Sequence, residues 1–404
     1  MKTTSPFGLF VLGYPVLVRH DGIRFGDRCY AETLSFTREF VPMSMIVART
    51  REHKTSHGFH ARLEDVCAKL ALALPDYGIG GWQGFLRTFI ILTSPTIRRS
   101  LRALLEQAEF IYVEGGTSPV AFLTAQIARQ MGRCLILEMR GSVVFNRHYM
   151  RQRFGLPGLA YQSLHHVFSA YVRRQSVAGL YISKDLMQRY PVAGSLRCEI
   201  SDAYLPEDFG SAPRHFTGPA RRYLYVGHLE TVKRVDLILR ALHLAREYLP
   251  HGWHFAIVGS GPLEADLRAL VDQLELGEHV SFHGRVQWGD PIKKFYHQAD
   301  ILLLASTTES GPRVAVEAMA SGLPVISTSV GITPELLDES VLVPVGDINT
   351  YAHRLAELIN DPIRLTEFSE RNWRLAQDFQ QPILEAKRRE FWKQAIEMSR
   401  RTAN

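Results

Sequence analysis

Two glutamates eight residues apart, Glu309 and Glu317, are the side chains in this sequence best suited to chemistry. Glu309 lies in a turn rich in serine, glycine and proline, whereas Glu317 has apolar neighbours on both sides, in the stretch AVEAMA. A lone buried carboxylate is costly unless it finds partners. For Glu317 the partner is either Arg313, four residues earlier on the same helix face, or the hydroxyls of a ligand such as a ribose diol or a sugar ring. Spacing alone leaves the two alternatives even.

The elements around these glutamates predict where they lie. Residues 299–306 (ADILLLAS) form a nearly continuous apolar run, which is typical of a buried parallel strand. Pro312 suits the first position of a helix that stops at Gly322, and residues 324–327 begin another strand. Glu309 is therefore expected in the loop at the carboxyl end of a strand, where open α/β sheets bind ligands. Glu317 is expected on the helix that follows.

Two further loops carry residues suited to binding an anion. In YVGHLETVKR, Gly227 and His228 follow a predicted strand and Lys233 precedes a predicted helix. Lys233 is either a phosphate ligand or a solvated lysine. In AIVGSGPLEADL, Gly259 and Gly261 would let backbone amides approach a ligand at the start of a helix.

The composition indicates a two-domain chain with substantial cores, because it has 404 residues, 46% of them hydrophobic and 22% charged. No apolar stretch is long enough to predict a membrane span, and the N-terminus lacks the pattern of a signal peptide. The four cysteines are scattered without metal-type spacing, which fits a reducing cytoplasm. We therefore expect a cytoplasmic protein that binds no metal and no other cofactor.

The positive charge is concentrated in the first half of the chain. Residues 1–210 contain 25 Lys and Arg against 17 Asp and Glu, whereas the remainder contains 22 against 24. Such an excess favours anionic surfaces or substrates, such as phospholipid headgroups or a pyrophosphate-linked molecule. No motif that reads nucleic acid accompanies it, so nucleic acid is not expected as a partner.

Both halves alternate strand-like and amphipathic runs, which predicts two doubly wound α/β domains with parallel sheets facing each other across a cleft. The strand-like runs are FGLFVLG, SMIVAR, FIYVEG, RCLILEM and GLYIS in the first half, and RRYLYVG, WHFAIVG, HVSFHG, DILLLAS and PVISTS in the second. Residues 211–219, rich in proline, glycine and small residues, predict a boundary that separates residues 1–212 from residues 213–380. A predicted amphipathic helix from about residue 381 to residue 404 would pack back on the first domain.

Four blocks in the second half resemble GT-B glycosyltransferases of family GT4. That family has a Gly-x-Leu…Lys turn, an I-V-G-x-G-P turn, an F-x-G-x-V strand and an E-x7-E block followed by E-A-M-A-x-G-x-P-V. The matching segments here are residues 227–233, 257–262, 282–286 and 309–325. The resemblance covers residues 222–375; the first half is similar only in its alternation of strands and helices.

The resemblance implies roles for individual residues. Glu309 would contact the hydroxyls of a donor sugar and stabilise the reacting centre, and Glu317 would accept hydrogen bonds from the nucleotide ribose. Lys233, with the helix amides after Gly311, would neutralise the leaving diphosphate. The remaining implied donor-binding positions are Gly227, His228, Gly259, Gly261, Ser310, Pro312 and Arg313, the Arg285–Val286 backbone near the nucleobase, and Gly22 or Gly26 of the first domain near the donor phosphate.

The sequence departs from the family pattern at three places. His228 replaces the usual arginine of the first turn, and Ser310-Gly311-Pro312 replaces Gly-Phe-Gly after Glu309. Arg140, in LILEMRGS, stands where many relatives have a histidine near the reacting sugar. Arg140 either serves catalysis by holding a sugar hydroxyl, a carboxylate or an acceptor phosphate, or it pairs with Glu138 or Glu114.

The resemblance thus implies a retaining, metal-independent hexosyltransferase that uses a nucleotide diphosphate sugar, with a UDP-sugar favoured over GDP-mannose. Its acceptor would be a glycan or a lipid-linked molecule in polysaccharide assembly, bound by the first domain. The basic first domain would attach peripherally to the anionic inner face of the cytoplasmic membrane. The alternatives are a non-catalytic scaffold subunit of a synthase complex and a sugar-nucleotide epimerase on the same fold.

Overall fold

A computed structural model of the 404-residue chain describes residues 7–12, 16–19, 22–25, 39, 41–52, 68–75, 81–141, 147–203, 205–206, 209–309, 311 and 313–401. The chain forms two compact units. Unit 1 comprises Met1–Ile200 and Ala386–Asn404, and unit 2 comprises Ser201–Glu385. The C-terminal residues thus belong to unit 1.

Within its described residues, unit 1 is built on a nine-stranded sheet of order β3-β2-β4-β1-β6-β7-β8-β9, with β5 also paired to β4. All pairs are parallel except the β2–β3 hairpin. The strands are β1 (Phe7–Val11), β2 (Val16–Arg19), β3 (Gly22–Phe25), β4 (Met43–Glu52), β5 (Ala68–Pro75), β6 (Ala108–Glu114), β7 (Leu135–Met139), β8 (Ser176–Tyr181) and β9 (Leu196–Glu199). The helices are α2 (Gly81–Thr93), α3 (Pro95–Gln107), α4 (Pro119–Gln130), α5 (Arg147–Arg174), α6 (Lys184–Arg189) and α14 (Gln381–Arg401).

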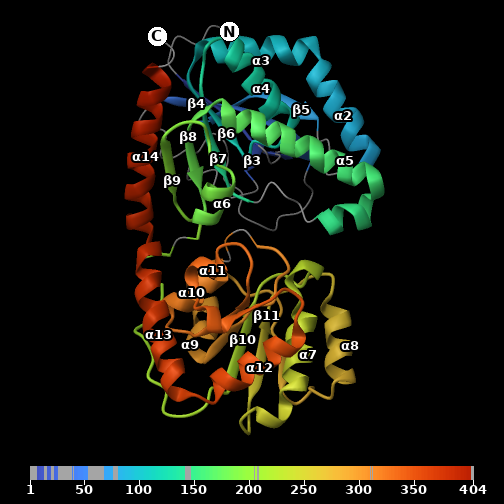
Figure 1. The fold of residues 1–404 in the computed structure, drawn as a ribbon, viewed down its shortest axis with the longest axis vertical. Coiled ribbons are helices and arrows are strands. Elements are labelled where there is room, and N and C mark those ends of the chain that lie inside the picture. The colour runs from blue at the N-terminus through green and yellow to red at the C-terminus, as the bar shows by residue number, and fades with distance from the viewer. Residues whose placement is uncertain are drawn as a thin grey trace. The chain divides into compact units, whose positions relative to one another are not determined.

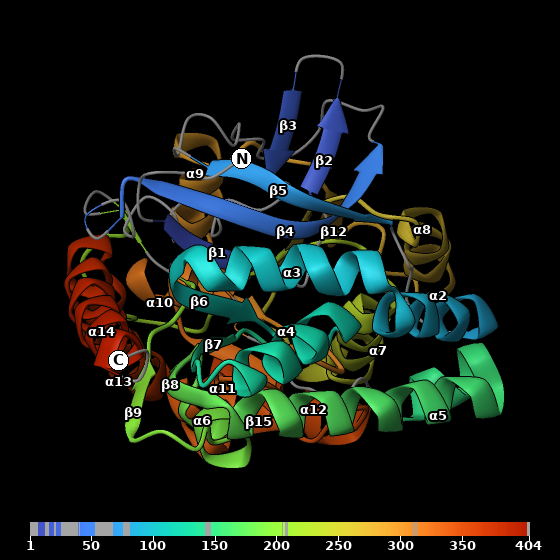
Figure 2. The same ribbon diagram turned by 90° about the horizontal axis from the view of Figure 1, so that it is seen from above.

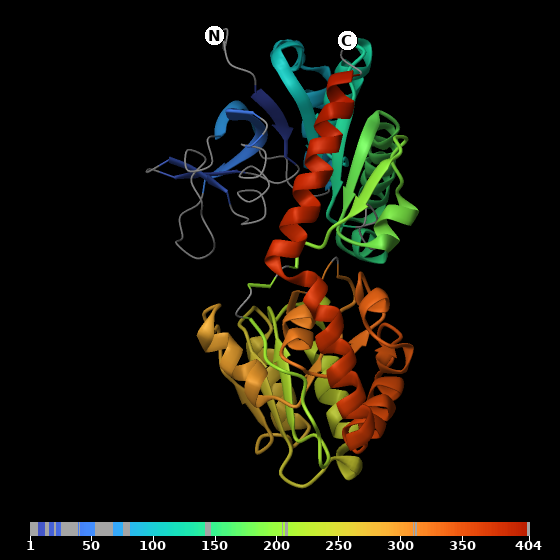
Figure 3. The ribbon, with the colours of Figure 1, turned by 90° about the vertical axis from the view of Figure 1, so that its left-hand side faces the viewer.

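Alternation along β6 explains how both faces of this sheet are covered. Ile111 and Val113 belong to the core formed with α3 and α4, and α3, α4 and α5 make a layer over that face (Figure 2). The intervening Tyr112 faces α14, whose Trp392 ring lies 5.4 Å from the Tyr112 ring. Figure 3 shows α14 running along unit 1. The C-terminal helix thus packs within unit 1.

His165 lies inside α5 and packs against aromatic rings of the same helix. Its ring is 4.1 Å from that of Tyr161 and 6.2 Å from that of Phe168. Of the helices that the described residues form, none combines the length and hydropathy needed to cross a bilayer.

Unit 2 has a six-stranded sheet in its described residues, all parallel, of order β12-β11-β10-β13-β14-β15 (Figure 1). The strands are β10 (Arg222–Val226), β11 (His254–Val258), β12 (Val280–Phe282), β13 (Ile301–Leu303), β14 (Val325–Thr328) and β15 (Leu342–Val343). The helices are η2 (Thr231–Lys233), α7 (Val235–Leu244), η3 (Arg246–Tyr248), α8 (Glu264–Gln273), α9 (Asp290–Gln298), α10 (Arg313–Ala320), α11 (Thr333–Leu336), η4 (Glu339–Val341), α12 (Ile348–Ile359), α13 (Pro362–Ala376) and η5 (Gln377–Phe379).

The order of this sheet is that of a doubly wound, Rossmann-like domain. From β10 the chain adds β11 and β12 on one side and then β13, β14 and β15 on the other, so the direction of winding reverses between β10 and β13. Ligands of such sheets bind beyond the carboxyl ends of the two strands at this reversal. The loops after β10 and β13 are those that carry Lys233 and Glu309.

Residues 201–219, within which the sequence predicted a domain boundary, belong to unit 2. The amide of Ser211 donates to the carbonyl of Ala320 (3.1 Å), and the amide of Phe216 donates to the Thr366 hydroxyl (3.0 Å). The proline and glycine composition of the segment reflects an irregular strap that is hydrogen-bonded to α10 and α13. The composition of this segment indicates that it lacks helix or strand. Its hydrogen bonds to α10 and α13 place it in unit 2.

Candidate functional site

An ion pair joins the two loops at the reversal of the second sheet. Lys233 Nζ lies 2.5 Å from Glu309 Oε1, and the Ser306 hydroxyl donates to the same oxygen at 2.7 Å. The backbone ties the loops together, because the Thr307 amide donates to the Val232 carbonyl at 2.8 Å. The structure thus brings together two residues 76 positions apart that the sequence predicted at one site.

The pair is accessible to a ligand. The Lys233 side chain is 26% exposed and that of Glu309 is 17% exposed, so the ammonium can exchange its carboxylate partner for an incoming anion. Beneath the pair, burial first and the Glu309 charge second raise the pKa of Tyr225, whose hydroxyl donates to the His228 carbonyl at 2.9 Å. The protonated phenol thereby fixes the turn after β10, on which the His228 side chain is exposed.

Glu317 is buried on α10 and has two donors that the sequence did not reveal. Tyr296 of α9 donates its hydroxyl to Oε2 at 2.7 Å, and Trp288 directs its indole Nε1 at Oε1 from 3.4 Å. Burial first, and then Glu317, hold the pKa of Tyr296 well above its usual value, so the phenol remains a donor. Arg313, half-buried at the start of the same helix, opposes that rise. The carboxylate is therefore stabilised in place by neutral donors and keeps lone pairs for hydroxyls of a ligand.

Arg214 anchors the helices that carry Tyr296 and Glu317. Its guanidinium donates to the carbonyls of Tyr296 (2.7 Å), Ala299 and Ser321 (3.1 Å), at the C-terminal ends of α9 and α10. Burial lowers the pKa of Arg214 to about 10, and the side chain stays charged at neutral pH. A cation that satisfies several terminal carbonyls also complements the helix dipoles. Arg214 thus sets the spacing of the two helices from within the strap.

Gly259 and Gly261, in the loop after β11, allow that loop to pack closely on the loop after β10. A Cβ added to Gly259 would lie 1.8 Å from the Gly227 carbonyl oxygen, and one added to Gly261 would lie 2.4 Å from the Leu229 carbonyl oxygen. The Leu229 amide also donates to the Ser260 carbonyl at 3.1 Å. The glycine pattern therefore indicates close contact between two loops at the carboxyl edge of the sheet, which holds their amides near the expected ligand.

The other predicted donor-binding positions lie as follows. Arg285 is exposed and Val286 half-buried in the segment after β12, and Gly311 directly precedes α10. Gly22 begins β3 and pairs with Arg19 in the hairpin. Gly26, Ser310 and Pro312 lie outside the described residues.

Arg140 lies in unit 1, where it takes part in a buried polar network. Its Nε donates to Glu138 Oε1 at 2.8 Å, and the Tyr112 hydroxyl donates to Glu138 Oε2. Burial would raise the pKa of Glu138, but the nearby Arg140 and Arg388 guanidiniums lower it overall. The pairing of Arg140 with Glu138 is thus observed, and it orients the guanidinium at the carboxyl end of β7. A role of Arg140 toward substrate stays a prediction.

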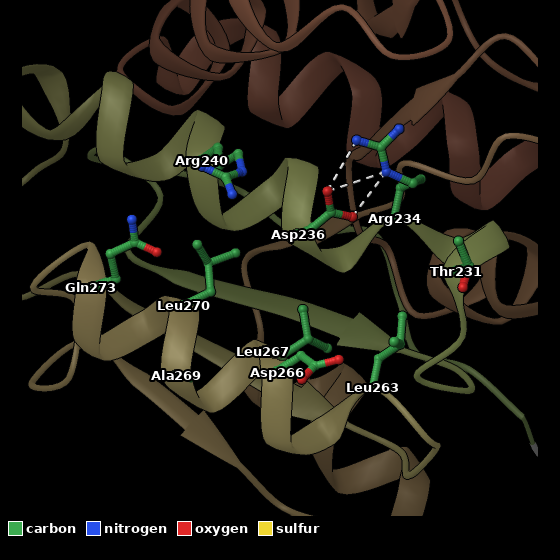
Figure 4. A pocket seen from close by; sticks show the side chains of 10 residues that line it. All are labelled: Thr231, Arg234, Asp236, Arg240, Leu263, Asp266, Leu267, Ala269, Leu270 and Gln273. Atoms are coloured by element: carbon green, nitrogen blue, oxygen red, sulfur yellow. Dashed lines mark hydrogen bonds and ion pairs between the residues drawn. The ribbon is translucent and has the colours of Figure 1, made fainter.

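A separate pocket of about 440 Å³ lies between α7 and α8 (Figure 4). Arg234 and Thr231, neighbours of Lys233, contribute to its lining, but Lys233, Glu309 and Glu317 do not. Arg234 is engaged by Asp236 through contacts of 2.9–3.2 Å. The pocket lining includes two arginines and two aspartates and therefore has no marked preference for an anion.

Among the described residues, no three His, Cys, Asp or Glu side chains are grouped closely enough to hold a metal ion. The residues that sequence reasoning missed are Ser306, Trp288, Tyr296 and Arg214. Ser306 precedes Glu309 by three positions, so a turn between them could have predicted their hydrogen bond. The other three contact Glu317 or its helix across elements, for which no local spacing exists.

Comparison with known proteins agrees with this geometry. Residues 213–374 match the family described as glycosyl transferases group 1. An "uncharacterized glycosyltransferase" of Haemophilus influenzae is 31% identical over 160 residues, which are 39% of this chain and 44% of that protein. The amylovoran biosynthesis glycosyltransferase AmsK of Erwinia amylovora is 32% identical over 38% of this chain and 39% of its own length. These matches span less than half of the length of either relative.

The fold similarity extends over nearly the whole chain. The crystal structure of Anabaena HepE in complex with UDP superimposes with a TM-score of 0.63 at 15% identity, covering 96% of this chain and 100% of that one. At this identity the likeness establishes the fold. Together, the two parallel-sheet units and the fold similarity give the chain the GT-B fold, and residues 213–374, which contain Lys233, Glu309 and Glu317, match the group 1 glycosyl transferases.

Proposed function

We propose that the protein is a retaining glycosyltransferase that moves a sugar from a UDP-sugar to a glycan or lipid-linked acceptor in polysaccharide assembly, without a metal ion. The observation that carries the proposal is the Lys233–Glu309 pair beyond the carboxyl ends of β10 and β13. Support also comes from relatives with biosynthetic names, such as the amylovoran enzyme, and from the UDP present in the HepE structure.

In the proposed reaction, Lys233 and Glu309 have separate roles. Lys233 would leave Glu309 for the donor diphosphate, and the amides at the start of α10 would share its charge. Glu309, still held by Ser306, would then accept hydrogen bonds from the sugar hydroxyls. Preorganised donors aimed at the charge that develops on a leaving group are a major source of catalysis.

Glu317 would bind the ribose hydroxyls with the lone pairs that Tyr296 and Trp288 leave open. Retention would follow from front-face departure, in which the leaving phosphate accepts the acceptor proton as the new glycosidic bond forms. In that reaction Glu309 and Glu317 do not act as the acid and base of a hydrolase. Arg140, at the carboxyl edge of the first sheet, would contact the acceptor.

A nucleotide-release assay with and without acceptor tests the proposal. Nucleotide sugars are first screened by thermal shift, and those that stabilise the protein are supplied to the assay. We expect release that increases with acceptor, and a product whose anomeric configuration matches the donor by NMR. A scaffold subunit would release nucleotide under neither condition, and an epimerase would convert the sugar nucleotide without acceptor; either result refutes the proposal.

A further inference from the structure

Helix α2 of unit 1 exposes an apolar face where a surface helix ordinarily presents polar residues. Leu86, Phe89 and Ile90, at positions i, i+3 and i+4, are 63%, 64% and 50% exposed. The opposite face is the buried one, because Thr88 and Ile91 are 2% and 0% exposed. At the edge between the two faces, Phe85 packs edge-on to Tyr161 of α5, with 5.6 Å between ring centroids. Single exposed apolar residues are ordinary, but three on one helical face form a patch.

The neighbouring helix α5 also exposes apolar residues. Leu156, beside the kink at Gly155, is 78% exposed, and Val167 is 59% exposed. Figures 1 and 2 both show α2 meeting α5. The unpartnered apolar side chains are therefore distributed over two helices in contact.

These two helices carry positive charge and no carboxylate. The sequence contains no Asp or Glu between Asp76 and Glu106, a span that includes all of α2. It contains none between Glu138 and Asp185, a span that includes all of α5. Exposed arginines in this part of unit 1 include Arg87, Arg99 and Arg151.

The two units of the chain have net charges of opposite sign. The difference between them is larger than the difference between residues 1–210 and residues 211–404. Unit 1, which gains the basic end of α14, contains 31 Lys and Arg against 16 Asp and Glu, a net charge of +15. Unit 2 contains 16 against 25, a net charge of −9. Attraction to an anionic surface is therefore a property of unit 1.

We propose that the α2 face formed by Leu86, Phe89 and Ile90, with Leu156 of α5, docks on an anionic lipid bilayer. The apolar side chains would enter the interface, and the arginines around them would contact lipid phosphates. This inference deepens the proposed function, because a lipid-linked acceptor is presented at a bilayer surface. Docking itself requires neither donor binding nor transfer.

The combination of features favours lipid over other partners. A nucleic acid would be matched by the arginines but would leave the apolar triad in water, and a second copy of this chain would set basic helices against each other. A bilayer with anionic headgroups complements both features at once. Association with another copy remains an outcome of the experiment.

The experiment is co-sedimentation of the full chain with vesicles, without nucleotide. We expect binding to vesicles of equal parts phosphatidylcholine and phosphatidylglycerol at low salt, little binding to phosphatidylcholine alone, and release at high salt. The triple variant Leu86→Ser/Phe89→Ser/Ile90→Ser should bind at least about tenfold more weakly. The matched control is Leu244→Ser/Tyr248→Ser, which changes exposed apolar residues of unit 2 and should bind as the native chain does.

Charge is tested separately. Arg99→Glu/Arg151→Glu should weaken binding by at least about tenfold, since each arginine near an anionic surface contributes severalfold. The control Arg240→Glu/Arg246→Glu makes the same change at exposed positions of unit 2. An unaltered thermal transition confirms that each variant is folded, because all the replaced side chains are exposed.

Three results would overturn the proposal: no binding of the native chain to either vesicle, equal binding to both, or native binding by the apolar triple variant. Sedimentation velocity adds a fourth, since a native dimer that the triple variant makes monomeric would assign the face to a second copy. Vesicle binding and nucleotide release are independent readouts. Failure of docking leaves the proposed transfer reaction intact, and failure of transfer leaves docking intact.

Discussion

At the scale of single residues, two carboxylates of one short segment have different surroundings. Glu309 is partly exposed and accepts hydrogen bonds from a lysine and a serine hydroxyl, whereas Glu317 is buried and accepts them from a phenol and an indole. The first can change partners when a charged ligand arrives. The second is fixed before the ligand arrives, so it contributes recognition at little cost in conformational entropy.

The substitution Glu317→Gln should weaken UDP binding, because one amide group replaces acceptor capacity and the remaining oxygen is neutral. A lost charge-assisted hydrogen bond costs about 1.5–3 kcal/mol, which is about a tenfold to hundredfold rise in Kd. Titration calorimetry measures it, with Glu357→Gln, an exposed change in the same unit, as the control. Unaltered affinity would limit Glu317 to its contacts with Tyr296 and Trp288.

The substitution Glu309→Gln should affect turnover more than nucleotide affinity, because its proposed contact is with the sugar. We expect kcat to fall by about a hundredfold or more, as on removal of an electrostatic group from other active sites. UDP affinity should change little or improve, since Lys233 loses its competing carboxylate. A large loss of UDP affinity with unchanged kcat would instead place Glu309 at the nucleotide.

At the scale of elements, buried charges lock helices to their positions. In unit 1, Glu138 of β7 lies near Arg388 of α14 and is paired with Arg140. In unit 2, Arg214 holds the ends of α9 and α10. Removing one partner of such a group leaves the others desolvated and unsatisfied, which costs more than the interaction itself contributes.

The substitution Glu138→Gln should destabilise unit 1 by about 3–5 kcal/mol, because buried arginines lose their counter-charge. The folded-state pKa of Glu138 lies below its ordinary value of 4.5, so its stabilisation is complete above pH 4.5 and is lost as the pH falls through the lower folded-state value. Chemical unfolding at several pH values measures both effects. Equal acid sensitivity of native and variant proteins below pH 4.5 would contradict this account.

The substitution Arg214→Lys should destabilise unit 2 by about 3 kcal/mol, since an ammonium cannot reproduce a guanidinium that donates to carbonyls of Tyr296, Ala299 and Ser321. UDP affinity should fall as well, because the Tyr296–Glu317 contact depends on the spacing of α9 and α10. The control is Arg246→Lys on the surface. A variant with native stability would show that the strap is held by its backbone contacts alone.

At the scale of the whole molecule, each unit has a distinct charge and a distinct proposed task. The acidic unit 2 nevertheless supplies the proposed site of an anionic donor, so local groups must overcome the average field there. Lys233 and the backbone amides at the start of α10 are the groups that would supply positive charge there. Charge neutralisation of the donor by such protein groups is the basis for expecting metal independence.

Transfer activity should therefore persist in excess EDTA, at a rate within about twofold of the untreated protein, because side chains and helix amides supply the positive charge. The release assay with acceptor measures it, before and after dialysis against the chelator. Activity that disappears with EDTA and returns with magnesium or manganese would show that a cation shares the diphosphate site.

The sequence by itself predicted ten of the described strands, but not β2, β3, β5, β9 or β15. It also predicted the loop positions of Lys233 and Glu309, the helix position of Glu317 and the resemblance of the second half to a known family. These features are local: a buried strand, a glycine turn and a helix start each have a period or a residue type that neighbouring positions reveal. For the same reason the apolar stripe of the C-terminal segment predicted an amphipathic helix with one buried face.

Tertiary structure alone decided the partners of the buried charges. Tyr296 and Trp288 reach Glu317 from another element, Arg214 reaches two helices from a segment that composition suggested was a linker, and Arg388 comes close to Glu138 from the far end of the chain. The sequence shows that a charged residue lies in an apolar segment and therefore needs a partner. Which group becomes that partner depends on which elements fold against each other.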